Sequence, residues 1–395
     1  MIKKDIFFWY IISSIITLIL FRNSVTTIVG SWLANVIIIL TSIFLPYFIL
    51  SFIKDKYKII HAYVFILFIL TIASILKNDS FLQPIIGFFN LASALSFFVS
   101  AFYIFKDKNK FIKKIIRLFV IISLINSAGA FIQVFISIDI FGLINNSVYT
   151  NIELMKTGNI QVRAISFISS PQSLSLTLSI ACILCLRFNP FENKNKNSLS
   201  FIICLLGGIL TISKAFYLPL CIFFFLEMIL KKNIKVIIVS IPILLILFMS
   251  TFTERIVEGF STIFNISEYS AYEHWINGLK EMDNISNFLF GKGVGYYSRG
   301  FQLLSGNDES VLSVESFIIQ LFSEAGLIIT LLFIIIIYIS LKLSFKKDYR
   351  WGLLQLSILS VGLFTPAIYG FVVGFQYYFI LLVPFYLNNQ QGITR

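Results

Sequence analysis

Long runs of apolar residues recur along almost the whole chain. One of them reads VIIVSIPILLILFM at positions 236–249, and others approach the ~20 residues that a helix needs to cross a hydrocarbon layer. The strands of a membrane barrel would alternate apolar and polar residues, and these runs do not alternate. The chain is 58% hydrophobic and 13% charged, whereas a soluble domain contains about 25% charged residues. The sequence therefore predicts an all-α polytopic membrane protein.

We expect about twelve transmembrane helices in a single integral membrane domain that covers residues 1–395. The first apolar run is expected to stay in the protein, because Arg22, Asn23 and Ser24 follow it in place of a small-residue cleavage site. The predicted segments are 6–21, 28–50, 59–76, 82–105, 118–138, 165–186, 199–212, 215–230, 236–251, 317–341, 351–368 and 371–387.

Lysine and arginine are distributed unevenly between the two sides of this predicted bundle. With the N-terminus in the cytoplasm, most of the 31 Lys and Arg residues fall in cytoplasmic connections, as the positive-inside rule requires. Both termini are then cytoplasmic. The Lys and Arg residues of the cytoplasmic connections account for the net charge of +12, so this charge does not imply a nucleic acid partner. Two long connections, 139–164 and 252–315, lie outside. The second is mostly polar, and a long polar loop on one side of a membrane protein is where function is first sought.

Metal-ligand patterns such as HExxH or paired CxxC motifs do not occur in the sequence. Cys182 and Cys185 form a single CxxC inside an apolar segment, where they are expected to act as small apolar residues. We therefore expect neither a metal nor another cofactor.

Two cations stand at the outer ends of predicted segments. Arg163 precedes segment 165–186, where it is either an interfacial anchor or a guanidinium fork for a phosphate at the membrane surface. Lys214 is the one charge between segments 199–212 and 215–230. A hairpin turn accounts for a polar residue there, but not for a cation on the side where cations are disfavoured. Lys214 therefore favours a functional interpretation.

Two further arginines lie in the long outer loop. Arg255 comes about one turn after the ninth segment and is expected near the lipid headgroups, and Arg299 follows the glycine-rich run 291–295. That run lacks the strand-turn-helix frame of a dinucleotide motif, so its glycines are expected to form a tight turn. A solvated loop face remains the alternative interpretation for both arginines.

Two glutamates flank the start of segment 317–341. Glu315 could accept a proton from a sugar hydroxyl, or it could be a carboxylate that the helix dipole favours at a helix N-terminus. Glu324 lies two turns further along and is expected to be buried and partnered.

Four short stretches between residues 158 and 330 form a further pattern. The first is Arg163 followed by Ser-Pro-Gln at 170–172, and the second is LTISK at 210–214. The third is WINGL at 275–279 leading to LFGKGVG at 289–295. The fourth is ESF at 315–317 leading to EAGLI at 324–328. Taken together, the four stretches resemble the O-antigen polymerase and O-antigen ligase superfamily. The resemblance covers about residues 158–330, and it rests on the order and spacing of the stretches together with the large outer loop.

The resemblance implies a metal-independent membrane glycosyltransferase of the bacterial cytoplasmic (inner) membrane. Such proteins act on the outer face, on oligosaccharide repeat units linked to undecaprenyl diphosphate, during lipopolysaccharide O-antigen or capsule synthesis. Glu315 stands at the family position for the base, and the cations available for the diphosphate are Arg163, Lys214, Arg255 and Arg299. The expected partners are the lipid-linked oligosaccharide and the bilayer, with a chain-length regulator protein as a further candidate.

Departures from the family pattern separate the alternative functions. Gln172 replaces the family's asparagine, and Lys214 replaces its arginine, which removes a bidentate fork. Ligases tend to carry a histidine near the position of Glu315, and this chain does not, which favours a repeat-unit polymerase over a ligase. The third alternative is a transporter of lipid-linked oligosaccharides, for which we would expect internal repeats, mid-span charges and short outer loops. A structural membrane scaffold would leave Arg163 and Lys214 unexplained.

Overall fold

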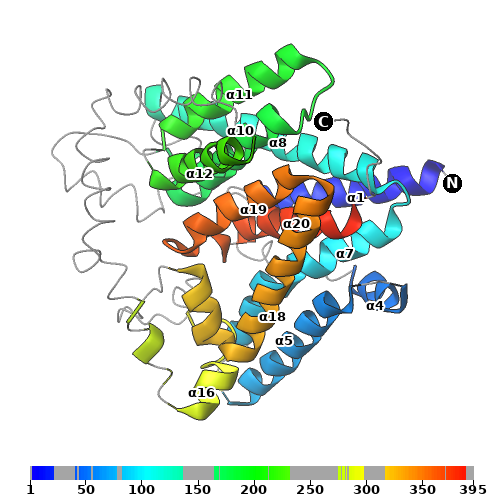
Figure 1. Ribbon diagram of the computed structural model, residues 1–395, viewed down its shortest axis with the longest axis vertical. Helices are drawn as coiled ribbons and strands as arrows, with labels where there is room; N and C mark the ends of the chain where they lie inside the picture. Colours follow the sequence, from blue (N-terminus) through cyan, green and yellow to red (C-terminus); the bar gives the residue numbers. More distant parts are fainter. Residues whose placement is uncertain are drawn as a thin grey trace. The chain divides into compact units, whose positions relative to one another are not determined.

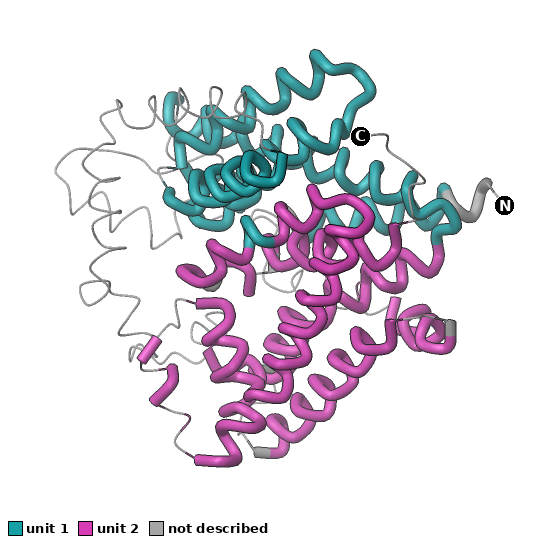
Figure 2. Tube along the Cα trace, viewed as in Figure 1, with its two compact units in different colours: residues 1–40, 105–256, 356–358 teal, residues 41–104, 257–355, 359–395 magenta. Residues whose placement is uncertain are grey.

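The computed structural model describes residues 2–21, 41, 44–54, 57–77, 82–136, 164–168, 170–211, 213–231, 275–276, 278–280, 282, 284–297, 316–369 and 371–387. All regular structure in these ranges is helical (Figure 1). The chain divides into two compact units (Figure 2): unit 1 consists of residues 1–40, 105–256 and 356–358, and unit 2 of residues 41–104, 257–355 and 359–395.

Unit 1 consists of helices and one 3-10 turn. Its described elements are α1 (Ile2–Leu20), α8 (Lys108–Phe135), the 3-10 turn η2 (Ser166–Ile168), α10 (Pro171–Arg187), α11 (Lys194–Ile209) and α12 (Lys214–Lys231). Near the start of α8, the guanidinium of Arg117 donates to the carbonyl of Pro190, in the connection between α10 and α11. At the other end of α8, Gln133 contacts the residues that precede α10. The start of α8 and the end of α10 therefore lie at the same end of unit 1.

A buried carboxylate ties the end of α10 to the end of α12. Glu227 is completely buried, and its oxygens lie 2.7 Å from Arg187 Nε and 2.7 Å from Lys231 Nζ. A carboxylate among apolar helices needs such partners, because leaving it buried and unpaired costs several kcal/mol. The guanidinium of Arg187 also lies over the ring of Phe224.

Unit 2 contains the remaining described helices. They are α4 (Leu45–Lys54), α5 (Lys58–Lys77), α6 (Leu82–Phe88), the π-helical turn η1 (Phe89–Ser93), α7 (Ala94–Ile104), α16 (Ile285–Phe290), α18 (Phe317–Lys347), α19 (Tyr349–Gly362, without 356–358), the 3-10 turn η4 (Pro366–Ile368) and α20 (Phe371–Tyr386).

Aromatic packing between α7 and α20 forms the centre of unit 2. The rings of Phe98 and Phe375 lie 4.5 Å apart, and Phe102 stacks on Tyr386 at the same distance. Aromatic side chains bury large areas and gain further from ring contacts, which stabilises the packing of these two helices. The ammonium of Lys347 caps the end of α20 by donating to the carbonyls of Pro384 and Leu387.

The prediction of an all-α protein with apolar spans is confirmed for the described ranges. Four helices there are long and apolar enough to cross a membrane: Lys58–Leu76, Gln83–Ile104, Lys108–Phe135 and Phe317–Lys347. Shorter apolar helices cover Ile6–Ile19, Pro171–Arg187 and Val372–Tyr386. The predicted segments 199–212 and 215–230 correspond to α11 and α12, which both begin earlier in the chain.

Several expectations of the sequence stay predictions. The predicted segment 236–251 and much of 28–50 lie outside the described residues, and so do most of the two predicted outer loops, 139–164 and 252–315. The number of spans, the large outer loop and the single membrane domain are therefore still predictions.

The pairing of Glu227 generates a stability prediction. Glu227→Leu should lower the free energy of unfolding by about 2 kcal/mol, less than the ~3–5 kcal/mol of a fully buried pair, because Arg187 and Lys231 are partly exposed. Thermal unfolding of the purified protein in detergent measures the change. The matched control is Glu192→Gln, since Glu192 is 85% exposed and lies 4.0 Å from Lys113. Equal destabilisation by the two substitutions would contradict this account of Glu227.

Candidate functional site

The predicted site residues fall mostly outside the described part of the chain. Arg163, Arg255, Arg299 and Glu315 lie there, and their roles stay predictions. Lys214 is described: it is exposed and is the first residue of α12. The geometry of the site is therefore built from Lys214 and from the described residues that adjoin the other four in the sequence.

A backbone hydrogen bond joins the two cation-bearing stretches of unit 1. Ala164, the residue after Arg163, donates its N–H to the carbonyl of Leu210 at 3.0 Å. Leu210 is the C-cap residue that follows α11, and it lies four residues before Lys214. Ala164, directly after Arg163, and Leu210, the first residue of LTISK, are thus neighbours in space although they are far apart in the sequence.

Gln133 fixes the segment that follows Arg163. This side chain near the end of α8 is completely buried, and its Oε1 accepts hydrogen bonds from the backbone N–H groups of Ile165 (2.9 Å) and Ser166 (3.0 Å). Ser166 adopts a positive φ of 47°, an uncommon backbone conformation for a residue other than glycine. One side chain therefore satisfies two buried donors that lie outside any α-helix.

The Ser-Pro-Gln sequence at 170–172 forms a helix start. Ser170 is the N-cap of α10 and accepts from the N–H of Ser173, and Pro171 occupies the first helical position, where its missing N–H is not needed. Gln172 is exposed on the first turn. Capping thus accounts for Ser170 and Pro171 in structural terms, and Gln172 is left as the exposed residue of this stretch.

Lys214 stands where a helix does not favour a cation. The N-terminal end of α12 carries the positive end of the helix dipole, which disfavours a neighbouring ammonium group. The turn before it is held by Thr211, whose hydroxyl donates to the carbonyl of Gly208 at 2.6 Å, and by the Ser213 hydroxyl, which accepts from the N–H of Ala215. Helix formation therefore gives no reason for a lysine at this position.

In unit 2, the carboxylate of Glu324 is the centre of a second cluster. Its oxygens accept from the N–H of Gly295 (2.9 Å), from the N–H of Tyr297 (3.0 Å) and from the amide of Gln320 (3.0 Å). The hydroxyl of Tyr369 is a fourth hydrogen-bond partner. Four donors fill the four acceptor positions that a carboxylate offers. The prediction that Glu324 is buried and partnered is thus confirmed, and no acceptor position is left for a substrate.

Tyr369 lies in the turn between α19 and α20, outside both helices. Its burial, together with the neighbouring carboxylate of Glu324, raises the pKa of the Tyr369 hydroxyl well above its ordinary value. The hydroxyl therefore keeps its proton and acts as the donor to Glu324.

A break in α18 makes room for the glycine-rich loop at 291–297. Gly326 has a φ of 76°, which interrupts the helix and leaves preceding carbonyls without their helical partners. Loop residues replace those partners, because Lys292 N–H donates to the carbonyl of Ser323 at 2.9 Å and Gly293 N–H to that of Glu324 at 3.1 Å. A Cβ on Gly326 would overlap the carbonyl of Leu289, so a larger residue does not fit there.

The sequence analysis did not single out Gln133 or Tyr369. Gln133 is a single polar residue near the end of an apolar segment, and Tyr369 is one of 17 tyrosines. Neither residue forms a motif with its sequence neighbours. The only signal in the sequence was a glutamine or tyrosine at the end of an apolar segment, and such a residue does not indicate which group it will bond to.

The comparisons with known proteins leave the family of the chain open. No model of a protein family matches it, and no curated protein matches it significantly. Among the described residues, no group of three or more His, Cys, Asp or Glu side chains could hold a metal ion. In its described ranges the protein is therefore an all-helical protein with apolar helices of membrane-spanning length, and a more specific function is a matter of proposal.

The hydrogen bonds of Glu324 lead to a prediction: substituting Glu324 should reduce the protection of nearby backbone amides from hydrogen exchange. Glu324→Gln replaces one acceptor oxygen by an NH₂ group that would face N–H donors, which should cost about 1–3 kcal/mol. We expect faster hydrogen exchange at the amides of Gly295 and Tyr297, measured on the purified protein by mass spectrometry. The amides of Ile165 and Ser166, which depend on Gln133 in unit 1, should be unchanged.

A reciprocal variant controls this experiment. Gln133→Leu should accelerate exchange at Ile165 and Ser166 and leave Gly295 and Tyr297 as in the unsubstituted protein. Uniform acceleration of all four amides in both variants would mean global destabilisation and would argue against two local clusters.

Proposed function

We propose that this chain is a polymerase of undecaprenyl-diphosphate-linked oligosaccharide repeat units. It is a metal-independent glycosyltransferase on the outer face of the bacterial cytoplasmic membrane, and its product is an O-antigen or a capsule. The observation that supports the proposal most is the hydrogen bond between Ala164 and Leu210, because it makes neighbours of the two stretches that carry Arg163 and Lys214. A lipid diphosphate at a membrane surface requires cations of this kind near the headgroups.

The reaction assigns a role to each candidate residue. A hydroxyl of the acceptor unit attacks the anomeric carbon of the donor chain, and the bond between that carbon and the diphosphate oxygen breaks. Glu315 takes the proton of the attacking hydroxyl. The negative charge that develops on the leaving diphosphate is stabilised by Arg163 and Lys214, and by Arg255 and Arg299 from the long loop.

The clusters of described residues support this assignment through position. Gln133 and Leu210 hold the backbone directly after Arg163. Glu324 accepts a hydrogen bond from the backbone of Tyr297, and Arg299 lies two residues after Tyr297. Glu315 directly precedes Ser316, the N-cap residue of α18. Each of these three candidate residues therefore adjoins a backbone segment of defined conformation, which favours catalysis because positioned charges need no rearrangement during the reaction.

A gene deletion tests the proposal. The surface glycan is separated on a gel, and the lipid-linked pool is extracted in parallel. A single repeat unit at the surface with the ladder lost supports the polymerase. A ladder that is still made but remains on undecaprenyl diphosphate would show a ligase instead. Lipid-linked single units that accumulate on the cytoplasmic face would show a transporter, and the proposed roles would be withdrawn.

Arg163 generates a prediction on the diphosphate site. Arg163→Ala should abolish the glycan ladder at an unchanged protein level, because the guanidinium fork to the diphosphate is lost. Lys214→Arg should retain the ladder, since it restores the residue of the resembling family. Lys194→Ala is the matched control, an exposed cation in the first turn of α11, and it should leave the ladder intact. A normal ladder from Arg163→Ala would remove the diphosphate role.

Glu315 generates a prediction on the base. Glu315→Gln keeps the size of the side chain but cannot take a proton, so it should lose most polymerisation, on the order of 10²–10⁴-fold in rate. The measurement is polymer formation from lipid-linked repeat units in membranes. Glu309→Gln, in the same predicted loop, should leave the rate unchanged. Full activity of Glu315→Gln would show that another group accepts the proton.

A further inference from the structure

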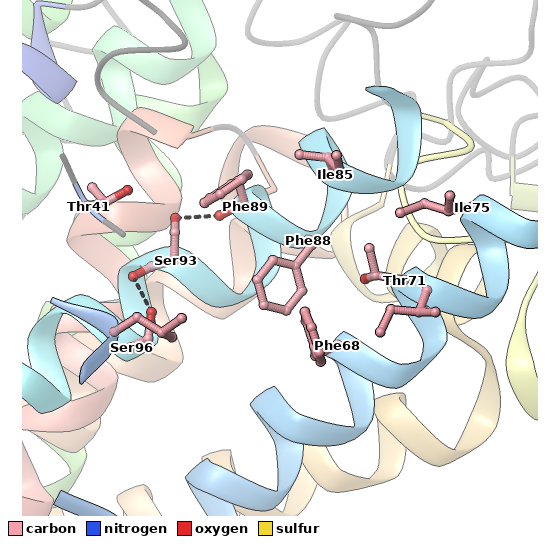
Figure 3. Close-up of a pocket in the computed structure, with 11 residues that line it drawn as sticks. Thr41, Phe68, Thr71, Ile75, Ile85, Phe88, Phe89, Ser93 and Ser96 are labelled. Atoms are coloured by element: carbon pink, nitrogen blue, oxygen red, sulfur yellow. Dashed lines mark hydrogen bonds between the residues drawn. The ribbon is translucent and has the colours of Figure 1, made fainter. Parts of the chain in front are cut away.

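An apolar cavity of about 320 Å³ lies in unit 2 between α5 and the continuous helix formed by α6, η1 and α7, and Thr41 together with Leu45, the first residue of α4, completes its lining (Figure 3). Phe68 and Thr71 line it from α5, and Phe88 and Ser93 line it from the facing helix. The rings of Phe68 and Phe88 meet edge to face at 5.8 Å. None of the described lining residues carries a charge, so a charged headgroup finds no counter-ion among them.

Three of the four hydroxyl groups of the lining donate to carbonyls of their own helices. Thr71 donates to the carbonyl of Leu67 at 2.8 Å, Ser93 donates to that of Phe89, and Ser96 donates to that of Ser93 at 3.0 Å. These hydroxyl groups therefore donate to backbone carbonyls, and the side chains present mainly hydrocarbon to the cavity. A cavity of this kind stays dry and takes apolar ligands.

The cavity opens on an apolar surface. Phe68 is 49% exposed and Ile72 is 44% exposed, and Phe65 and Ile69 on the same helix are exposed as well. Helix α5 is one of the helices long and apolar enough to cross a membrane. In a bilayer the opening would therefore face lipid chains.

The dimensions of the cavity fit one chain from one leaflet. The lining along the facing helix extends from Ile85 to Ser96, which is about 16 Å at 1.5 Å per residue. This length is about half of a ~30 Å hydrocarbon layer. A cavity of ~150 Å³ takes one benzene, so about 320 Å³ takes on the order of twelve carbon atoms. An acyl chain meets both limits, whereas an undecaprenyl chain is much longer.

Both walls of the cavity also hold the glycine-rich loop. The hydroxyl of Ser74 on α5 accepts from the N–H of Val294 at 3.2 Å. On the facing helix, Gly87 approaches Gly295 so closely that a Cβ on Gly87 would overlap the backbone of Gly295. The π-helical turn η1 follows one residue after Phe88, and such turns are frequent at functional sites. An occupant of the cavity would therefore brace the two helices that support this loop.

We propose that this cavity binds one acyl chain of a bilayer glycerophospholipid. The chain lies along the walls formed by α5 and by α6, η1 and α7, and its headgroup remains at the membrane surface. This site does not depend on the glycosyltransferase activity, since it follows from the lining, the opening and the length of the cavity alone.

Photolabelling in vesicles tests this site. The full chain is reconstituted in vesicles of phosphatidylethanolamine and phosphatidylglycerol that contain a trace of phosphatidylethanolamine with a diazirine on one acyl chain. After irradiation, peptides are mapped by mass spectrometry. We expect label on Thr71 and Ser93, which are only 4% exposed, in addition to label on exposed residues such as Phe65. Lipid that only surrounds the protein would label the exposed residues alone, and that result would overturn the proposal.

Two matched variants sharpen the test. Ile72→Trp places a larger side chain at the opening and should remove most of the label from Thr71 and Ser93 while label on Phe65 stays. Ile69→Trp lies on the same helix, is 48% exposed before substitution and is not among the lining residues, so it should change nothing. Unchanged label in Ile72→Trp would contradict the site. Loss of label on adding undecaprenyl phosphate at the concentration of the probe would assign the cavity to a polyprenyl chain and overturn the choice of an acyl chain.

Discussion

The carboxylate of Glu324 shows the constraint on which the rest of this structure depends. Polar groups that are withdrawn from water must find partners within the protein, because an unpartnered one costs several kcal/mol. Glu324 meets this requirement with Gly295, Tyr297, Gln320 and Tyr369, drawn from a loop, from its own helix and from a distant turn. The break at Gly326 extends the same requirement to the carbonyls of α18, which the loop then satisfies.

Unit 1 meets this constraint with other residues. Gln133 satisfies the backbone where the chain enters η2, and Glu227 is balanced by Arg187 and Lys231. In both units the side-chain partners gather where regular helices end or break, since that is where backbone groups lack helical partners. Ser170, Leu210 and Glu324, from three of the stretches that the sequence analysis singled out, lie at such places. Helix ends thus place hydrogen-bonded backbone next to candidate residues such as Lys214.

The proposed catalytic residues and the proposed lipid site draw on different physics. The diphosphate needs cations placed near the membrane surface, and their effect is electrostatic. The cavity between α5 and the helix of α6, η1 and α7 offers hydrocarbon surface, and its selectivity comes from shape and length. The loop at 291–297 adjoins both proposed sites. It contacts the helices of the cavity at Gly87 and Ser74, and Arg299 follows it two residues later.

The sequence by itself determined the helical class, the positions of most of the described apolar helices, and the burial of Glu324. These features follow from local periodicity and from the cost of burying charge, both of which are readable along the chain. Only the tertiary structure decided which residues are partners. Tyr369 and Glu324 are 45 residues apart, and Gln133 and Ile165 are 32 apart. Such pairs depend on which helix ends pack together, and side-chain type alone does not encode that choice.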